Sequence, residues 1–270
     1  MISSQILEKE SDALVEFSIF IMGLIFGSFL NMLIYRLPLG ISLINPKRSI
    51  CPNCDTQIKW YENIPLVSFI LLKGRCSSCD DKISFIYPIV ETITLIVTLL
   101  LFLKLGLTLD FIIACLLFYT IIILSFIDLK YKAVPDYLLI IAMIFAYFTI
   151  GFSLSHALLF AGGAVLLEFF ITFYIQNIKA KLLKDDSLKE QKAMGEGDIP
   201  IFAIIGGLLS IKLGMIAIFL SAILAIIPAI LNSIIKKEIE TAFIPFLGLA
   251  LFLVFIFDEY ILELSKGILL

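Results

Sequence analysis

The chain has 270 residues, of which 61% are hydrophobic and only 16% are charged, and its mean hydropathy is +1.08. A soluble globular domain is about half apolar and about a quarter charged, so this excess excludes an ordinary soluble domain and indicates that the lipid bilayer is the solvent for most of the chain. The net charge of −3 is too small to indicate a nucleic-acid partner.

Apolar segments of membrane-helix length recur along the whole chain. A bilayer-spanning helix needs about 20 mostly apolar residues. The candidate segments are residues 13–35, 86–104, 109–127, 137–152, 155–175, 198–212, 214–235 and 243–260. The first is too long for the apolar core of a signal peptide, so a retained helix is expected. The sequence predicts an all-α polytopic membrane protein with about eight transmembrane helices.

The distribution of basic residues predicts the orientation of these helices. If the N-terminus lies outside, all but four of the 20 Lys and Arg residues fall in the segments on the inner side. The four exceptions are Lys9, Lys104, Lys212 and Lys266. The positive-inside rule therefore favours both termini outside. This orientation places Asp128 and Asp198 at the cytoplasmic ends of their helices, although neither acid entered the count.

The polar segment 38–85 carries four of the five cysteines and is expected to form a small cytoplasmic domain inserted after the first helix. The predicted division is therefore 1–37 for the N-terminal helix, 38–85 for the cysteine domain and 86–270 for the remaining membrane domain. The segment 176–197 mixes basic and acidic residues and is expected to be a solvated cytoplasmic loop.

The cysteines form two CxxC pairs, Cys51 with Cys54 and Cys76 with Cys79, which 21 residues separate. This spacing is typical of a four-thiolate zinc site, and a metal compensates for the small core of so short a segment. Two disulfides are the alternative, but the cytosol keeps thiols reduced. Four thiolates leave no open position on the ion, so the zinc is expected to be structural. Cys115 is interpreted as a small apolar side chain.

Two acids border apolar segments, Asp128 after one and Asp198 before another, and an acid in such a place is a candidate functional residue. The alternative for Asp198 is a helix N-cap followed by Pro200 in the first turn. For Asp136 the N-cap is the favoured interpretation. Asp128 cannot be a cap because it ends a helix, where the helix dipole disfavours an anion.

If Asp128 and Asp198 face each other, their repulsion keeps one protonated while the other acts as a base. This is the arrangement of an aspartic peptidase, in which the carboxylate activates a water and the carboxylic acid polarises the scissile carbonyl. Gly195 and Gly197 are expected to let the backbone turn where a side chain would block it. Glu196 is interpreted as modulatory or merely solvated.

Several motifs accompany these acids in a fixed order along the chain. They are Gly27-Ser28-Phe29-Leu30-Asn31, Tyr35-Arg36-Leu37-Pro38, Cys51 to Cys54, Trp60 to Pro65, Gly74 to Cys79, Tyr87 to Glu91, Asp128 with Pro135-Asp136, and Gly195-Glu196-Gly197-Asp198. This ordered set resembles the type IV prepilin peptidases, which are membrane aspartic peptidases that also N-methylate their products. The resemblance covers most of the chain.

The resemblance implies that Asp128 and Asp198 are the catalytic pair in a bacterial cytoplasmic (inner) membrane enzyme. It implies cleavage of prepilin or pseudopilin leaders at the cytoplasmic face, and methyl transfer from S-adenosylmethionine to the new N-terminus. No motif locates the methyl donor, and the segment from Gly27 to Arg36 and the cysteine domain are the places where it is expected. The sequence departs from the family pattern at Pro200, where a basic residue is usual.

Three other functions remain alternatives at this point. The first is an ion- or proton-coupled transporter that uses the membrane-edge acids, although no internal repeat is visible. The second is a zinc-domain scaffold for pilus assembly proteins, which would not need either aspartate. The third is a protease that cuts inside the bilayer, but acids at the cytoplasmic edge favour a cut beside the membrane.

Overall fold

A computed structural model of the protein describes residues 2–44, 50–51, 53–183, 186–189, 194–235 and 241–268. These residues are mainly helical and contain no strand, only two isolated β-bridges in the cysteine segment. They form two compact units, which divide between Cys115 and Leu116. Six basic residues of the orientation argument lie outside the described residues, namely Lys47, Arg48, Lys184, Lys192, Lys236 and Lys237.

The first unit consists of two long helices and the cysteine segment between them. Helix α1 (Ile2–Arg36) packs along α3 (Ile86–Leu105), and the intervening segment carries the 3-10 turn η1 (Trp60–Asn63) and the short helix α2 (Val67–Leu71). The two long helices touch at Gly27, where an added Cβ would lie 2.6 Å from the Glu91 Cα. The glycine therefore permits the backbone contact on which the pair is built.

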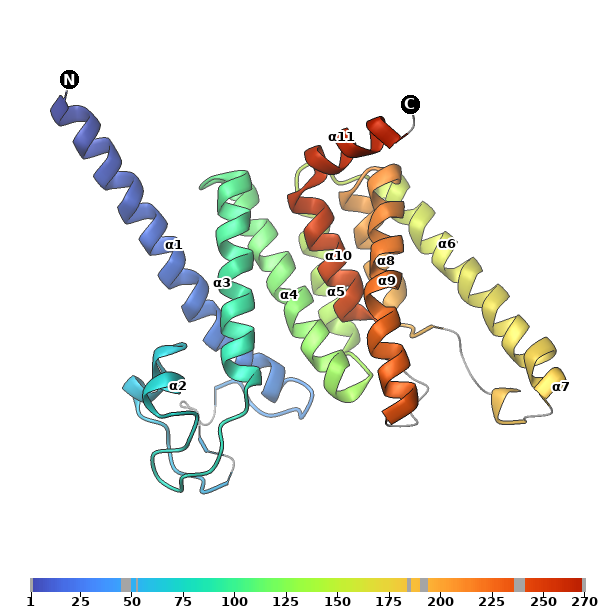
Figure 1. The fold of residues 1–270 in the computed structure, drawn as a ribbon, viewed down its shortest axis with the longest axis horizontal. Helices are drawn as coiled ribbons and strands as arrows, with labels where there is room; N and C mark the ends of the chain where they lie inside the picture. The colour runs from blue at the N-terminus through green and yellow to red at the C-terminus, as the bar shows by residue number, and fades with distance from the viewer. Residues whose placement is uncertain are drawn as a thin grey trace. The chain divides into compact units, whose positions relative to one another are not determined.

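The second unit is a helical bundle, whose element order Figure 1 shows. Helix α4 (Leu109–Tyr131) begins in the first unit and continues into this one. The other elements are α5 (Asp136–Phe148), α6 (Leu154–Phe173), the π-helical η2 (Tyr174–Lys179), α7 (Ala180–Leu183), η3 (Asp186–Lys189), α8 (Asp198–Leu208), α9 (Ile211–Ile235), α10 (Ile244–Ile256) and α11 (Asp258–Ile268). The expected loop 176–197 thus begins as a helical continuation of α6.

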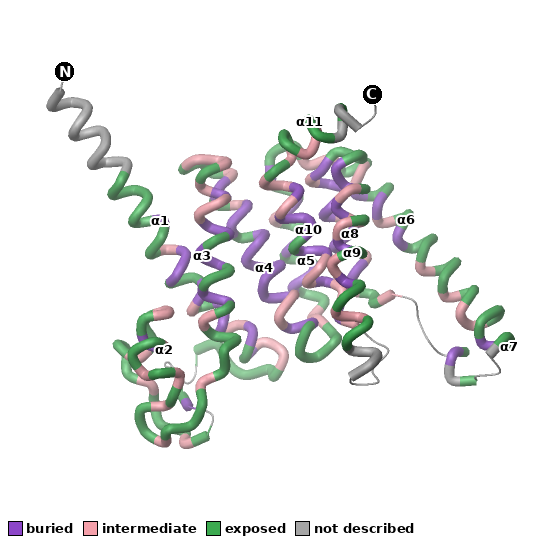
Figure 2. The backbone as a smooth tube through the Cα atoms, in the orientation of Figure 1, coloured by how far each residue is buried: buried purple, intermediate pink, exposed green. Residues whose placement is uncertain are grey.

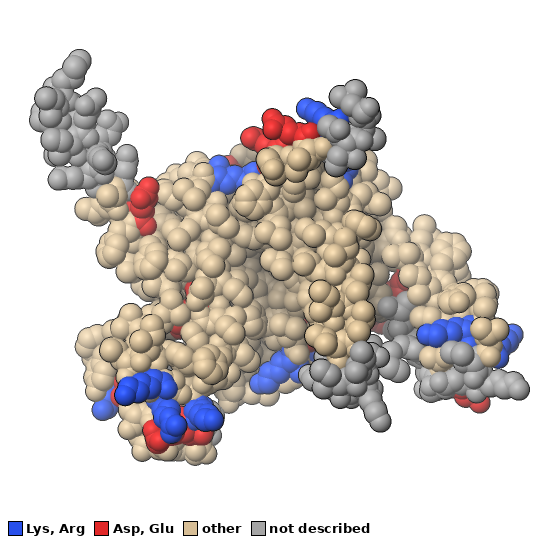
Figure 3. Space-filling view, in the orientation of Figure 1, with Lys and Arg blue, Asp and Glu red and all other residues tan. Residues whose placement is uncertain are grey.

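The helices confirm the prediction of a polytopic membrane protein. Among the described residues, five helical segments are long and apolar enough to span a bilayer, and α10 with α11 forms a sixth if the 81° bend between them lies within one span. Helices α5 and α8 are apolar but shorter. Every one of the eight predicted segments therefore corresponds to an apolar helix. In Figure 3, acidic side chains gather over α11, whereas the helix surfaces of this unit below it are almost free of charge on the face drawn.

The two short helices are held within the second unit by glycine contacts. A Cβ on Gly207 of α8 would lie 2.1 Å from the Phe152 ring, and the Gly207 carbonyl accepts a hydrogen bond from the Ser153 N–H over 2.8 Å. The turn before α6 therefore packs directly on the end of α8. Figure 2 shows the buried residues concentrated in α4, α8 and α10 of this unit, while much of α6 is exposed.

Candidate active site

Asp128 lies in the last turns of α4 and is only 7% exposed. Its Oδ2 accepts a hydrogen bond of 3.2 Å from the backbone N–H of Ile244, the first residue of α10. That N–H belongs to the four at a helix start that have no partner inside the helix. The carboxyl that is unfavourably placed at the end of its own helix thus lies against the positive end of another, where an anion is stabilised.

Asp198 is the first residue of α8 and is 6% exposed. Its Oδ2 accepts a hydrogen bond of 3.1 Å from the Gly195 N–H, and its own N–H donates to the Gly195 carbonyl, also over 3.1 Å. The cap of the helix is Gly197, so the alternative in which Asp198 itself is the N-cap is wrong. The carboxyl instead closes the turn that carries it.

Asp136 is likewise not an N-cap, although the sequence favoured that role. The N-cap of α5 is Pro135, with no side-chain cap hydrogen bond, and Asp136 is the first residue of the helix. The proline has φ −69° and ψ 128°, which is the extended conformation of a cap residue, and so the cap position falls one residue earlier than expected. Asp136 still lies in the first turn, where the helix dipole favours an acid.

The second unit brings Asp128 and Asp198 to one place. Gly197, the residue before Asp198, faces Ile244, with 3.5 Å between an added Cβ and the Ile244 Cδ1, and Ile244 is also the residue that hydrogen-bonds Asp128. The charge of Asp128 acts on Asp198. Two acids that are 70 positions apart in sequence thus lie within electrostatic range of each other.

The two glycines of the loop have a different role from the one expected. Neither Gly195 nor Gly197 has a positive φ, so no conformation forbidden to a side chain is needed. Gly197 is needed for space, because its Cβ would lie 2.7 Å from the Val134 Cγ2, whereas a Cβ on Gly195 would make an ordinary contact of 3.4 Å with the Asp198 Oδ2. Glu196 is exposed, as a solvated side chain would be.

Two further groups at this site were not predicted from the sequence. One is the Ile244 N–H, which no side-chain pattern reveals. The other is Glu168 of α6, whose charge also acts on Asp198. A signal for Glu168 exists, because it is the only acid in the apolar span Leu154–Leu182 and such an acid is a candidate functional residue by its position alone.

The four paired cysteines form a cluster in the first unit. Their sulfur atoms all lie within 4.8 Å of one another, and those of Cys51 and Cys79 are 3.9 Å apart. Zinc binds thiolates at about 2.3 Å in a tetrahedron, which places the sulfurs about 3.8 Å apart. The cluster therefore fits one tetrahedral zinc ion, and the cysteines are not paired as disulfides.

The two cysteine loops have the same backbone structure. In the first, the Cys51 N–H donates to the Thr56 carbonyl over 3.0 Å and the Asp55 N–H to the Cys51 carbonyl over 2.9 Å. The second loop repeats both bonds between Cys76, Asp80 and Asp81, and Asp55 and Asp80 share a positive φ of 53° and 60°. Each loop thus turns its two cysteines toward the same point, as one shared metal ion requires.

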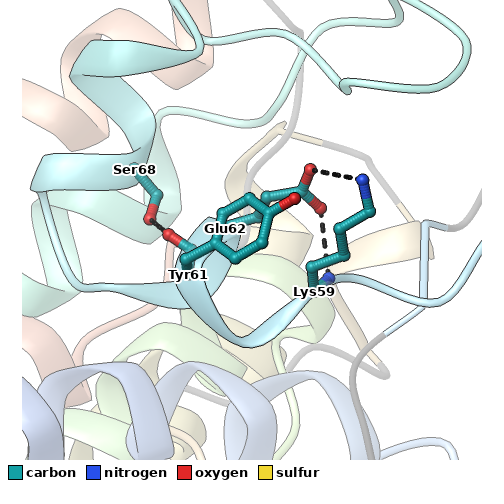
Figure 4. Close-up of polar contacts among 4 residues, drawn as sticks. All are labelled: Lys59, Tyr61, Glu62 and Ser68. Atoms are coloured by element: carbon teal, nitrogen blue, oxygen red, sulfur yellow. Dashed lines mark hydrogen bonds and ion pairs between the residues drawn. The ribbon is translucent and has the colours of Figure 1, made fainter.

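Between these loops, Glu62 fixes the η1 turn (Figure 4). Its carboxylate accepts a hydrogen bond of 3.1 Å from the Lys59 N–H and approaches the Lys59 ammonium, while the Ser68 hydroxyl donates to the Tyr61 carbonyl over 2.8 Å. The hydrogen bond from the Lys59 backbone is the main cause that lowers the pKa of Glu62. The turn therefore favours the ionised form of this carboxylate.

Two of the sequence motifs, and the residue directly after a third, meet where the cysteine segment joins α1 and α3. The buried Glu91 accepts a hydrogen bond of 2.8 Å from the Leu66 N–H, and Leu66 has φ 60°. A left-handed backbone is uncommon for leucine and costs free energy, so the Glu91 bond helps to hold it. The buried Asn31 amide donates to the Tyr87 carbonyl over 3.0 Å.

Known proteins match both units of the chain. A model of the type IV leader peptidase family matches residues 115–230, and one of the bacterial peptidase A24 N-terminal domain matches residues 21–105. The prepilin leader peptidase/N-methyltransferase of Vibrio cholerae serotype O1 is 34% identical, over 77% of this chain and 82% of its own length. The proteins of the same name from Legionella pneumophila and Bacillus subtilis are 34% and 29% identical, over 84% and 91% of this chain and over 84% and 95% of their own lengths.

The chain belongs to the type IV leader peptidase family. It is therefore a multi-pass membrane enzyme, and the transporter alternative finds no support. The match to the first family model ends at residue 105 and the match to the second begins at residue 115, next to the point where the two compact units divide. No solved structure matches the chain.

Proposed function

We propose that this chain is an aspartic endopeptidase that removes the leaders of prepilins or pseudopilins at the cytoplasmic face of the membrane, with Asp128 and Asp198 as its catalytic pair. The observation that carries this proposal is the meeting of two buried carboxyls at the edge of an apolar bundle, each with a backbone N–H donor. The names of the relatives supply the substrate class and imply that the same protein N-methylates the new N-terminus.

The two acids divide the work of hydrolysis between them. One is ionised and takes a proton from a water molecule as that water adds to the scissile carbonyl. The other is protonated, hydrogen-bonds the carbonyl oxygen as it gains negative charge, and the pair then supplies a proton to the leaving nitrogen. The C–N bond breaks, leaving a carboxylic acid on the leader and an amine on the pilin. Repulsion between the two carboxyls maintains the unequal protonation.

Zinc is assigned to Cys51, Cys54, Cys76 and Cys79, which would bind it as thiolates. Its contribution is structural, because four sulfur ligands complete the tetrahedron. S-Adenosylmethionine, when bound, supplies the methyl group. The space beside Gly27, where the donor was expected, is filled by the Glu91 backbone, so that glycine does not fit a binding role.

A cleavage assay with single substitutions tests the catalytic pair. Membranes that carry the wild type, Asp128→Asn or Asp198→Asn receive a prepilin, and mass spectrometry reads the product N-terminus. Each substitution is expected to lower the cleavage rate by about 10⁴-fold or more, as the loss of a catalytic acid does. Asp258→Asn removes an acid from α11, beyond the other end of α10, and is expected to cut normally.

The same assay decides against the proposal if either catalytic variant still cuts at a normal rate with normal protein levels. Pilus assembly that survives both substitutions would favour the scaffold alternative instead. A product 14 Da heavier than the unmodified N-terminus would report the methyl transfer that the relatives' names imply, since a methyl group replaces one hydrogen.

A further inference from the structure

Glu168 has an unusual position for an acid. It is the only acid in the apolar helical segment Leu154–Leu182, it is half-buried, and among the described residues it has no hydrogen bond or ion pair. A carboxylate in apolar surroundings is costly unless a cation or a donor compensates it. Selection of such a residue by stability alone is therefore not expected, and a ligand that supplies the missing charge is the natural explanation.

The packing of α6 on α8 fixes where Glu168 lies. Gly206 of α8 allows close contact, since a Cβ there would lie 2.6 Å from the Phe160 Cγ of α6. The turn at Phe152 and Ser153, which precedes α6, contacts Gly207 near the end of α8. The two helices therefore run antiparallel. Residues four apart lie near one another along one side of a helix. Glu168 lies eight residues after Phe160 on α6, and Asp198 lies eight residues before Gly206 on α8.

The residues midway between these two levels of the helix pair are buried. Ala164 is 2% exposed and Phe202 is 4% exposed, as expected if they pack between the helices. Glu168 is therefore level with Asp198 along the helix axes, and its charge acts on that residue. The level of Asp198 is also the level at which the scissile bond must arrive.

Beyond this level α6 leaves the bundle. The residues after Glu168 present large apolar side chains that no described helix covers, and Phe169, Phe170 and Phe173 are more than half exposed. In Figures 1 and 2 this half of α6 projects away from α8 and is mostly exposed. In a membrane this face is open to lipid, and a substrate helix in the lipid has direct access to it.

We propose that Glu168 binds the α-ammonium group of the newly cut pilin helix, an assignment that rests on the proposed peptidase function. Hydrolysis releases a primary amine, which takes up a proton and becomes a cation at the apolar edge of the site. The side chains of Asp128 and Asp198 already have backbone N–H donors, whereas Glu168 has none among the residues that the structure describes. The leader residues lie on the cytosolic side of the bond, so the new N-terminus is the cation at the level of Glu168.

Binding of two product peptides tests this assignment without any turnover. The probes are the apolar N-terminal helix of a pilin with a free α-amine and the same peptide N-acetylated, each titrated against the full-length protein in lipid nanodiscs at neutral pH. The wild type is expected to bind the free amine about tenfold more tightly, a difference typical of one charged hydrogen bond. Glu168→Gln is expected to bind both peptides equally.

Two further variants separate the charge at this position from charge in general. Glu168→Asp keeps the anion and is expected to keep most of the preference. Glu263→Gln removes an exposed acid from α11 and is expected to keep all of it. The acetylated peptide is the folding control, because Glu168→Gln is expected to bind it as the wild type does.

Each other outcome overturns the assignment. An equal affinity of the wild type for both peptides, or a preference that survives Glu168→Gln, shows that another group meets the amine. Loss of acetylated-peptide binding in Glu168→Gln shows that the residue is structural. Cleavage of the full precursor by the same wild-type sample separates these failures from failure of the proposed function, because a wild type that cuts but shows no preference contradicts only the ammonium site.

Discussion

At the scale of single residues, the site depends on how closely the turn formed by residues 195–198 approaches its neighbours. Gly197 lies against Val134 and Ile244, and Ile244 holds Asp128. A methyl group at Gly197 must push these side chains or the turn itself away. Any such movement changes the geometry of both acids, because the turn carries Asp198 and the neighbour holds Asp128.

The first prediction follows from this contact. Gly197→Ala is expected to lower the cleavage rate by about tenfold to a hundredfold, since a displacement of about 1 Å costs about a hundredfold and overpacking costs about 1–3 kcal/mol. Gly195→Ala, which adds the same methyl group in the same loop at ordinary contact distance, is expected to retain most activity. The assay is prepilin cleavage at equal protein levels. Equal loss in both variants would show that the spacing at Gly197 is not special.

The sequence identified the functional residues from their chemical type, but it did not predict which groups they contact. Asp128 and Asp198 stood out because a carboxyl at the edge of an apolar segment needs an explanation. Their relation to the Ile244 N–H was not predictable, because a backbone donor leaves no side-chain signature. The same holds for Gly197, whose importance comes from a neighbour across the fold and not from its own φ.

At the scale of elements, length and hydropathy predicted the helices well because each apolar run must satisfy its backbone internally in lipid. The bend between α10 and α11 was not predicted, because residues 243–260 were taken as one span although Asp258 and Glu259 interrupt its apolar run. The sequence also did not predict that the two cysteine loops have the same turn. The CxxC spacing predicted a common ligand, but not that both loops close with the same pair of hydrogen bonds.

The second prediction concerns the zinc ion assigned to the two cysteine loops. Purified protein is expected to contain about one zinc ion per chain, and Cys76→Ser is expected to lose it, because three thiolates bind zinc more weakly than four. Cys115→Ser is the matched control, since Cys115 is buried in α4, away from the cluster. Elemental analysis gives the metal content. Loss of zinc is also expected to expose residues 50–82 to proteolysis, while a metal-free wild type that resists the protease would contradict the structural role.

At the scale of the whole molecule, the number of crossings depends on the two short helices. Helix α5 has 13 residues and α8 has 11, which give lengths of about 20 Å and 17 Å, less than the hydrocarbon core of about 30 Å. Both connect longer spans through turns that pack on one another, and buried backbone need not meet lipid. We therefore infer that each still carries the chain across, as the predicted eight-helix topology requires.

The final prediction tests this topology together with the orientation. An epitope tag at the C-terminus and another within η3 (Asp186–Lys189) are expected to lie on opposite sides of the membrane, the first outside and the second in the cytoplasm. Protease added to spheroplasts is expected to remove the C-terminal tag and to reach the η3 tag only after permeabilisation. The reverse pattern would place Asp128 and Asp198 outside. Because a pilin leader stays in the cytosol until it is cut, that outcome would contradict the proposed cleavage even if both acids proved essential.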